Sequence, residues 1–482
     1  MRRIGLLAAV VAACLSVPAL AEEPDRTVSG EIVGADNQSY KAIPFDVPEG
    51  VERITVRLTY DRQNKTVIDL GVFDPQRFRG WSGGTRDRFT LSESDASPGY
   101  LPGALPAGRW HVQFGVPNAR PDSRSAYRLD IFFDRGEARN ATAAIADPPV
   151  KAAPGWYRGD LHMHDAHSDG GCASQSGKRV PCPLYRTVEA AAGRGLDFIA
   201  VTDHNTVSHF GGLRELQPAF DRMLLIPGTE ITTFHGHANI FGPARWVDFR
   251  VGTPGVPTIG AVEAAVQKAG AILSINHPSH PSGEICMGCG WTWPDTDWSK
   301  VSAIEVVNGF NAEGPLSGLG YWYARLNEGK RLAGIGGSDN HDATAGPDKA
   351  PIGRPTTVVH ARELSQAGIV DGIRAGNVFI DVEGTRDRLL EVTASSDKAT
   401  AAMGESLRAA GVVRVQARVQ GVTAGTLRLI VRGEERERRE LGSGEAEFAL
   451  PRGTACGWIS VNVGSSEGRL LLIGNPVYVT CK

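Results

Sequence analysis

The 482-residue sequence lacks two features that would directly indicate a membrane location or a nucleic-acid partner. After the first 21 residues it has no apolar stretch of the roughly 20 residues that a bilayer-spanning helix needs. It also lacks an excess of either charge, because 51 basic residues stand against 54 acidic ones and the net charge is −3. We therefore expect no transmembrane segment and no nucleic-acid partner held by attraction to its phosphates.

The first 21 residues have the order of features of a secretory signal. Arg2 and Arg3 precede an apolar stretch at residues 4–20, and the small-residue sequence Ala-Leu-Ala ends at Ala21. We expect cleavage after Ala21 and a secreted or periplasmic location. Loss of the two arginines would change the net charge from −3 to about −5. Cys14 offers an alternative, a lipoprotein cleavage site that would tether the protein to a membrane, but the apolar stretch continues past it, so we rank this second.

Cysteine is scarce, and six of the seven cysteines would remain after export. An even number in an oxidising compartment favours disulfides over metal-bound thiolates. The sequence does not define the pairing, but neighbours along the chain suggest the pairs Cys172–Cys182, Cys286–Cys289 and Cys456–Cys481. The close pair Cys286 and Cys289 could instead be half of a zinc site, although no second pair of this spacing exists to complete it.

Short alternating segments fill the two ends of the chain. In residues 22–137 they are separated by Gly, Pro, Asn and Asp, and period-two alternation with turns at this spacing predicts an antiparallel β-sandwich. Residues 138–154 are rich in Ala and Pro, which indicates a linker. The alternation returns in residues 384–482, where it predicts a second β-sandwich fastened by the Cys456–Cys481 bridge.

The middle of the chain, residues 155–383, has a different pattern. Apolar β-branched segments there alternate with helical ones. We expect helices at residues 187–194, 261–269, 316–328 and 364–374, each followed by a strand, at residues 198–201, 271–275, 332–335 and 378–380. Strands separated by such helices form parallel βα units, and about 230 residues of them fit a barrel. The expected fold class is therefore α/β, a distorted βα barrel flanked by N-terminal and C-terminal β-sandwiches.

Histidine is concentrated in this middle part. Ten of the twelve histidines lie between His162 and His341, and most follow an apolar segment or stand beside a carboxylate. Imidazole and carboxylate groups bind zinc, manganese or iron, and a carboxylate can bridge two ions. His162 and His164 would project from the same face of an extended strand, so that one metal could take both. Because most of these residues come where a strand is expected to end, the sequence predicts a multi-metal site at the rim of the barrel.

The candidate ligands occur in a fixed order of motifs. These are His162-x-His164 with Asp169 seven residues after the first His, Thr-Asp-His204, Gly-Thr-Glu230, His-Gly-His237, His277-Pro, and Ser-Asp339-Asn-His341. This ordered set resembles the PHP (polymerase and histidinol phosphatase) superfamily of metal-dependent hydrolases, and within it the group named for carbaryl hydrolase. The resemblance covers roughly residues 155–383.

The resemblance implies a distorted βα barrel with two or three divalent ions, zinc, manganese or iron, at its mouth. Carried over by motif, the first metal would be held by His162, His164, Glu230 and Asp339, which are also the expected catalytic residues. Glu230 would bridge to a second metal, completed by His237 and His277. The third metal would be held by Asp169, His204 and His341.

Some positions depart from the family's pattern or allow two interpretations. Asp165 stands where the family usually has Thr, and His167 stands where an ordinary residue is common; both could support the ligands or donate a proton. His235 competes with His237, which we prefer because the residues after it match the family's motif. Asp203 could cap a turn or orient a metal-bound water.

Other histidines and one arginine allow simpler interpretations. A single buried His is usually a satisfied core residue, as we expect for His111, His209 and His360. Arg354 is the nearest basic candidate for binding a substrate phosphate, but a surface salt bridge would explain it equally well.

The expected function is an exported hydrolase in which metal-activated water attacks a phosphoester, as in a phosphatase, a phosphodiesterase or an exonuclease-like enzyme. Phosphoesters are favoured because most of the resembled superfamily acts on them. The alternative is a carbamate or carboxyl ester, as the name of the subgroup implies. A binding module without activity is less favoured, because every expected ligand position is filled. The partner would be a small-molecule ester, and the sequence does not define an oligomeric state.

Overall fold

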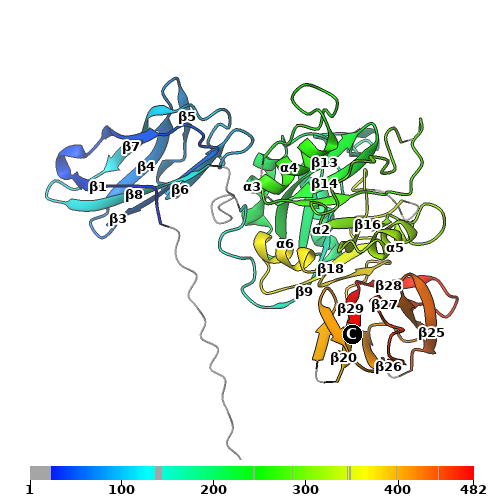
Figure 1. Cartoon of the computed structure of the whole chain (residues 1–482). Helices are drawn as coiled ribbons and strands as arrows, with labels where there is room; N and C mark the ends of the chain where they lie inside the picture. Colours follow the sequence, from blue (N-terminus) through cyan, green and yellow to red (C-terminus); the bar gives the residue numbers. More distant parts are fainter. Residues whose placement is uncertain are drawn as a thin grey trace, which may run out of the picture.

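The computed structural model describes residues 23–135, 144–242, 245–284, 286–344, 346, 349–397, 399–442 and 444–481. The expected secretory signal and Cys14 lie outside these residues, as does the start of the expected linker. Within the described residues, none of the helices combines the length and the apolar character that crossing a membrane requires. Strands far outnumber helices along the chain (Figure 1).

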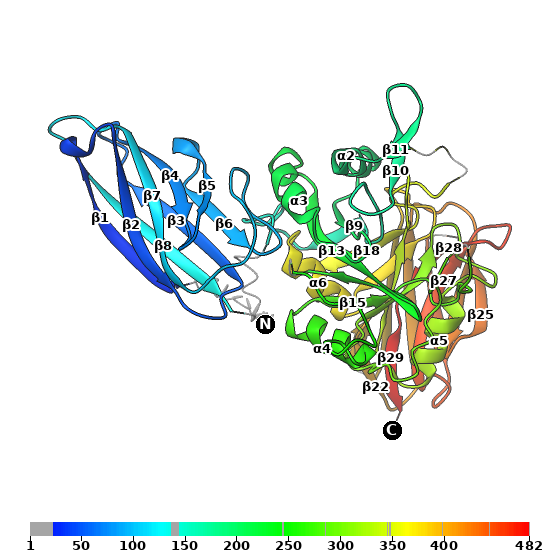
Figure 2. The ribbon, with the colours of Figure 1, turned by 90° about the horizontal axis from the view of Figure 1, so that it is seen from above.

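The N-terminal part consists of two antiparallel sheets that share one core. The first sheet has the order β1 (Arg26–Val33), β8 (Arg124–Asp134), β3 (Arg53–Tyr60) and β6 (Arg88–Ser92). The second has the order β2 (Ser39–Val47), β7 (Gly108–Asn118), β4 (Val67–Phe73) and β5 (Phe78–Trp81). Alternate side chains of these strands, such as Trp110, Phe114 and Leu129, fill the core between the sheets. Figure 2 shows this part standing to one side of the rest of the chain.

The central part is built on one curled, mixed sheet. Its strands are β9 (Gly155–Asp160), β12 (Phe198–Val201), β13 (Leu224–Thr233), β14 (Gly236–Phe241), β15 (Ile272–Ile275), β16 (Ala303–Asn308), β17 (Ala333–Gly337), β18 (Thr356–Ala361) and β19 (Val378–Asp381). They lie side by side in the order β17, β16, β15, β14, β13, β12, β9, β18 and β19. The segment that follows β17 lies beside the segment that follows β9. There the Asp339 amide donates a hydrogen bond to the His162 carbonyl at 2.8 Å.

The strand directions differ from those of regular βα units. β12 is parallel to β9 and β13, and β15, β16 and β17 are parallel, but β14 is antiparallel to both of its neighbours. Only Phe234 and His235 separate β13 from β14, and a parallel crossover needs a dozen or more residues. β18 is also antiparallel to β9 and β19. The sheet is therefore mixed where the sequence predicted parallel units, and the expected distorted barrel stays a prediction.

Four of the described helices lie close to where the sequence places them, and another, at residues 210–216, was not expected. The described helices are α2 (Leu184–Arg194), α3 (Phe210–Leu216), α4 (Ile259–Lys268), α5 (Leu319–Asn327) and α6 (Gln366–Arg374). α2 buries Leu184, Val188 and Ala191, which share one helical face, and it ends at Gly195 with φ 73°, a left-handed conformation that favours glycine. Ser365 is the N-cap of α6, and its side chain accepts a hydrogen bond from the Gly368 amide.

The C-terminal strands extend the central sheet. These strands are β20 (Leu389–Ser396), β21 (Ala399–Ala402), β22 (Ser406–Ala409), β23 (Val413–Gln420), β24 (Thr426–Val431), β25 (Glu434–Glu440), β26 (Glu445–Leu450), β27 (Gly457–Gly464), β28 (Leu470–Gly474) and β29 (Val477–Cys481). β28 pairs antiparallel with β19, and the sheet continues through β27, β24 and β25. A separate sheet has the order β21, β20, β23 and β26.

The central and C-terminal parts also share side-chain contacts. Trp322 of α5 and Trp458 of β27 belong to one buried apolar cluster. The Asn475 side chain accepts a hydrogen bond from the Gly334 amide and donates one to the Gly334 carbonyl, both at 2.8 Å. The domain boundaries that we predict at residues 137, 154 and 383 stay predictions, but β28 and Asn475 bind the last strands directly to the central sheet.

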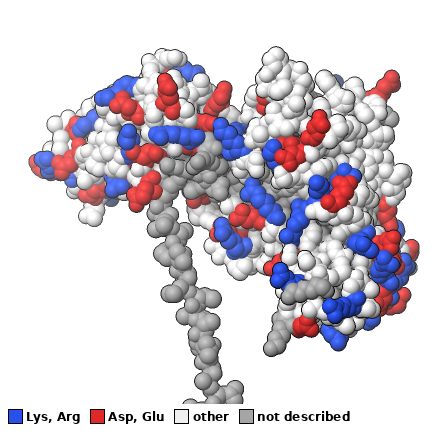
Figure 3. Space-filling view, in the orientation of Figure 1, with Lys and Arg blue, Asp and Glu red and all other residues white. Residues whose placement is uncertain are grey.

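A buried charge cluster joins the N-terminal sheets to the central part. Asp95, which follows β6, accepts hydrogen bonds from Arg53 of β3 and from Arg214 of α3, the latter at 2.7 Å. Glu52 and Arg245 form a second ion pair between the two parts. On the visible face of the whole molecule, basic and acidic side chains are interspersed without a large patch of either sign (Figure 3).

The six described cysteines pair as their spacing suggests. The Cα atoms of Cys172 and Cys182 lie 4.8 Å apart, and those of the Cys286–Cys289 and Cys456–Cys481 pairs lie 5.5 Å apart. The first pair closes the small hairpin of β10 (Gly171–Ala173) and β11 (Arg179–Pro181). The second lies in the connection between β15 and β16, beside the site described next.

Candidate metal centre

All nine residues that the sequence predicts as ligands come together at one end of the central sheet. They are His162 and His164 after β9, Asp169 before β10, His204 after β12, Glu230 in β13, His237 in β14, His277 after β15, and Asp339 and His341 after β17. The sheet order makes neighbours of strands that are far apart in the sequence, so these side chains converge. They form adjoining groups, which we call the first, second and third pockets.

The first pocket is formed by two histidines and two carboxylates. The Nε2 atoms of His162 and His164 lie 3.2 and 3.1 Å from Oδ1 of Asp339. The same nitrogens lie 3.5 and 3.6 Å from the two oxygens of Glu230. Ligand atoms around a tetrahedral zinc ion, at about 2.0–2.1 Å from the metal, are about 3.3 Å apart. The four side chains are therefore spaced to surround one cation.

Glu230 connects the first pocket to the second. Its Oε1 lies 3.4 Å from Nδ1 of His237 and 3.4 Å from Nε2 of His277, which form the second pocket. The other oxygen lies 2.9 Å from Nδ1 of His204. Only 1% of Glu230 is exposed, and the Asn276 amide also donates to Oε1, at 2.9 Å. A buried carboxylate that faces imidazoles on both sides is placed to bridge two cations.

The third pocket lies on the more open side of the centre. Oδ1 of Asp169 is 3.3 Å from Nε2 of His341 and 3.7 Å from Nε2 of His204. His164 also reaches this group, so it borders the first and third pockets. Because the Asp169 side chain is 57% exposed, this pocket is the one most open to solvent.

Three of the candidate ligand histidines have one ring nitrogen bonded to a backbone carbonyl or to a carboxylate that is not a candidate ligand. Nδ1 of His162 is 2.9 Å from Oε1 of Glu305, Nδ1 of His341 is 2.9 Å from the Asp339 carbonyl, and Nε2 of His237 is 3.2 Å from the Met287 carbonyl. A carboxylate or carbonyl accepts the N–H of that nitrogen, which leaves the lone pair on the other nitrogen. In each ring the free nitrogen is the one that faces its pocket.

A buried nitrogen of His162 supports the same assignment. Nε2 of His162 is buried without a hydrogen-bond partner among the described residues. A buried polar atom without a partner costs free energy. For His162 this atom points into the first pocket, where a cation would satisfy it. The donor set thus fits a metal centre.

The charges of the centre are strongly coupled. Burial by itself raises the pKa values of Glu230 and Asp339, but His162 and the neighbouring histidines hold both well below their ordinary values. Burial lowers the pKa of His162, yet Asp339, Glu305 and Glu230 hold it well above its ordinary value. The two carboxylates and the His162 ring thus favour each other's charged forms, and metal binding at this centre would release protons.

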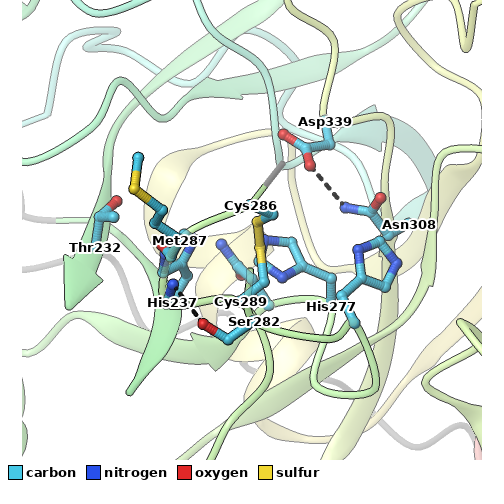
Figure 4. Close-up of a disulfide and its surroundings, with 12 residues drawn as sticks. Thr232, His237, His277, Ser282, Cys286, Met287, Cys289, Asn308 and Asp339 are labelled. Atoms are coloured by element: carbon cyan, nitrogen blue, oxygen red, sulfur yellow. Dashed lines mark hydrogen bonds between the residues drawn. A yellow bond between two sulfur atoms is a disulfide. The ribbon is translucent and has the colours of Figure 1, made fainter. Parts of the chain in front are cut away.

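Two residues of the centre were missed by the sequence analysis. Glu305 of β16 accepts hydrogen bonds from His162, from the His277 amide at 2.8 Å and from the Asn308 side chain at 3.1 Å. Asn308 also donates to Oδ2 of Asp339 at 3.1 Å (Figure 4). The signal that could have found Glu305 is a single carboxylate in the otherwise apolar residues 303–307, because such a charge is rarely buried without a partner.

Asp165, His167, Asp203 and His235 lie outside the donor groups. Oδ1 of Asp203 accepts from the Asp165 amide at 3.0 Å and from the Ser168 hydroxyl, so it fixes the loop that carries Asp169. His167 contacts the Ser208 hydroxyl, and the His235 ring packs against Trp293.

The three histidines expected in the core have different surroundings. His209 is buried, as predicted, and burial lowers its pKa to about 4. His111 is half-buried against Phe73. His360 is exposed near the end of β18 against Trp156, so the expectation of burial is wrong there.

A cavity of about 320 Å³ opens beside the first and third pockets. Asp339 and His341 line it together with Phe310 and Lys349. The Phe310 ring is 47% exposed, and the Arg354 guanidinium lies 4.9 Å from its centroid. The cavity therefore offers an aromatic surface and a cationic side chain beside the donors.

Comparison with models of protein families and with curated proteins finds no match. Two solved structures are similar to parts of the chain. One, from Bacteroides vulgatus, is a two-domain protein containing a predicted PHP-like metal-dependent phosphoesterase, with 18% identity, coverage of 67% of this chain and 94% of that one, and a TM-score of 0.39. The other is a candidate metal-dependent phosphoesterase from Bifidobacterium adolescentis, with 17% identity, 40% and 92% coverage and a TM-score of 0.29. At these TM-scores, neither likeness establishes a shared fold or activity.

Proposed function

We propose that the protein is a metal-dependent hydrolase of the PHP type that cleaves phosphoesters. The observation that carries this proposal is Glu230, a buried carboxylate whose two oxygens lie within 3.6 Å of nitrogens from five histidines. A structural core has no need of so many adjacent ionisable groups, and their burial is costly without a cation.

Each pocket would have its own ligands. The first would use His162, His164, Asp339 and one oxygen of Glu230, the second the other oxygen of Glu230 with His237 and His277, and the third Asp169, His204 and His341. Divalent cations bound there would supply an activated water and stabilise negative charge on a leaving oxygen. We assign two or three ions of zinc, manganese or iron, since imidazole and carboxylate donors suit all three metals.

The protein's own side chains would orient these ligands and the substrate. Glu305 holds the His162 ring, and Asn308 holds the Asp339 carboxylate, so both donors are fixed before a cation arrives. The cavity with Phe310 and Lys349 would receive the substrate, with Lys349 near its anionic group. The Ser208 hydroxyl lies 2.7 Å from Nδ1 of His167, but both side chains lie outside the donor groups, which favours attack by water held at the pockets.

A carbamate or carboxyl ester is the second candidate substrate. The observation that favours it is the exposed Phe310 ring, which would suit an aryl group, in a cavity with few cationic side chains. A phosphomonoester dianion usually requires several basic contacts, whereas an aryl carbamate requires none.

We also propose the wider setting of this activity. The central residues 155–383 would form a distorted barrel, with a β-sandwich at residues 22–137 and another at residues 384–482. Three disulfides support an oxidising compartment, and thus export by the N-terminal signal, because such bonds are rare in the cytosol.

The test combines metal analysis with a panel of substrates. Purified holoenzyme should contain two or three equivalents of divalent metal and should cleave bis(4-nitrophenyl) phosphate or a nucleoside phosphate. Activity should disappear on chelation and return with manganese or zinc. The hydrolytic activity of His162→Ala should be several orders of magnitude lower than that of the wild type, because water with its ordinary pKa of about 15.7 is a poor nucleophile. His360→Ala, an exposed histidine outside the centre, is the matched control.

The outcomes separate the candidates. Cleavage of aryl carbamates or carboxyl esters without any phosphoester would transfer the proposal to the second substrate class. A metal-loaded protein that cleaves no ester of either kind would contradict a hydrolase and leave a metal-stabilised binding module.

A further inference from the structure

The connection between β15 and β16 carries the sequence Cys286-Met-Gly-Cys289 and lies directly on the β13–β14 hairpin. Gly288 has φ +84°, and a Cβ atom on it would lie 2.2 Å from the Thr233 carbonyl and 3.2 Å from Nε2 of His237. No side chain fits there. The Gly288 amide also donates to the Ser282 hydroxyl at 2.9 Å, which fixes the loop in this position (Figure 4).

This loop brings a sulfur atom to the second pocket. Sγ of Cys289 belongs to a group with His237 and His277 in which all ligand atoms lie within 4.8 Å of one another. All three residues are buried, and Figure 4 shows the disulfide beside both imidazoles. Imidazole and thiolate together are a preferred donor set for zinc. As long as Cys289 is bonded to Cys286, its sulfur is not a thiolate and cannot serve as this ligand.

The disulfide form gives the loop a different contact with the pocket. The Met287 carbonyl, held between the two cysteines, accepts the N–H of His237 Nε2 at 3.2 Å. The other nitrogen, Nδ1, then faces Glu230. In this state the loop orients a ligand without supplying one.

We propose that the Cys286–Cys289 disulfide is a redox switch of the second pocket, whose reduction by a dithiol turns Cys289 into an additional protein donor beside His237, His277 and Glu230. The oxidised loop leaves a His–His–carboxylate pocket, and the reduced loop adds a thiolate to it, which favours zinc over harder ions such as manganese. This inference rests on the proposed metal centre and adds a means of regulating it.

The different burial of the two sulfurs defines the course of reduction. Cys286 is half-buried, whereas Cys289 is 2% exposed, so an incoming thiolate reaches Cys286 first. Its attack on Sγ of Cys286 forms a mixed disulfide and breaks the bond to Cys289, which leaves with the electron pair as a thiolate. The second thiol of the dithiol then displaces Cys286 as a thiol and closes the reductant into a disulfide. Two electrons pass to the protein; one dithiol proton remains on Cys286, and the other is released when Cys289 stays a metal-bound thiolate.

Cobalt binding reports the new ligand independently of catalysis. Protein reduced with a dithiol, freed of reductant under anaerobic conditions and titrated with Co²⁺ should develop the near-ultraviolet thiolate-to-cobalt charge-transfer absorption. The oxidised protein should bind cobalt without that absorption.

Two serine variants form a matched pair. Cys286→Ser leaves Cys289 permanently free and should show the absorption without reduction. Cys289→Ser should lack it in every state, even though its other two disulfides meet the same reductant. Zinc should bind Cys286→Ser about tenfold or more tightly than Cys289→Ser in competition with a chromophoric chelator, because the first retains the thiolate ligand.

The result is separable from that of the proposed hydrolase. If neither reduced wild type nor Cys286→Ser shows the absorption, the switch is wrong, whatever the activity. If the absorption appears in both while no ester is cleaved, the switch stands and the proposed function fails. If circular dichroism shows that Cys286→Ser is misfolded, the reduced wild type can be compared with reduced Cys289→Ser instead, and this tests the same thiolate ligand.

Discussion

Nδ1 of His162 lies 2.9 Å from Oε1 of Glu305, and both side chains are buried. The other oxygen of Glu305 accepts the His277 amide hydrogen at 2.8 Å. One carboxylate, which is not itself in a donor group, thus positions residues of the first and second pockets. Its negative charge also keeps the His162 ring basic, which strengthens the ring as a ligand once the proton is displaced.

Glu305→Gln should therefore weaken metal binding while the fold remains. The amide keeps the shape of the side chain but removes the charge, and loss of such a supporting partner lowers metal affinity or activity by about 10–100-fold. Zinc affinity measured by chelator competition checks this. Glu263→Gln is the control, since Glu263 is also buried but accepts from the Asp297 amide away from the centre. Equal affinities in the two variants would contradict the positioning role.

Glu230→Gln and Asp169→Asn should differ in how many ions they lose. Glu230 faces both the first and second pockets, so its variant should lose more than one equivalent of metal. Asp169 belongs to the third pocket, where it lies 3.3 Å from His341 and 3.7 Å from His204, so its variant should lose at most the third ion. Inductively coupled plasma mass spectrometry, applied to the two variants after parallel dialysis, measures their metal content and so tests this difference. A Glu230→Gln protein with full metal content would show that the carboxylate does not bridge.

Asp95→Asn should destabilise the protein by about 3–5 kcal/mol, because it removes the negative charge that faces two buried arginines. Thermal unfolding at neutral pH measures this, with the exposed Glu93→Gln as the control.

The same carboxyl group predicts a pH dependence. Burial by itself would raise the pKa of Asp95, but Arg214 and Arg53 lower it below its ordinary value. The stabilisation is therefore present above the unfolded-state pKa of about 3.9 and is lost as the pH falls through the folded-state value. Between about pH 5 and pH 3 the wild type should lose more of its thermal stability than Asp95→Asn. Parallel losses in the two proteins would show that another group is responsible.

Asn475→Ala should loosen the attachment of the last strands to the central sheet. It removes both hydrogen bonds to Gly334 and leaves that buried peptide group unpaired, at a cost of about 1–3 kcal/mol. Hydrogen exchange of the Gly334 amide should accelerate before global unfolding. Asn118→Ala, which removes one exposed side-chain hydrogen bond, is the control and should leave this amide unchanged.

Local patterns predicted much of the central part. The expected helix at residues 187–194 lies within α2, and the expected strand at residues 198–201 coincides with β12. These elements follow from apolar periodicity, which is a local property of the chain. The candidate ligands could also be predicted, because each stands at or near a strand end in a recognisable motif, and the structure places all nine together.

Pairing between distant strands could not be predicted in the same way. The apolar segment of β28 suits a separate sandwich as well as an extension of the central sheet, and only the partner β19 decides between them. β14 runs antiparallel to β13 because the connection between them is too short for a crossover. The pattern of apolar residues gives no information on strand direction. Glu305 was missed because its role depends on a histidine that precedes it by 143 positions.

Because β28 pairs with β19, the edge of β19 stays uncovered during synthesis until β28 has been translated. When the ribosome has completed Asp381, about 90 more residues must be translated before Leu470 to Gly474 can cover the open edge of β19. At about 5–20 residues per second, that edge presents unpaired backbone groups for about 5–20 seconds. During this interval the nascent sheet is exposed to edge-to-edge aggregation, and chaperone binding there would protect the part of the chain that gathers the metal ligands.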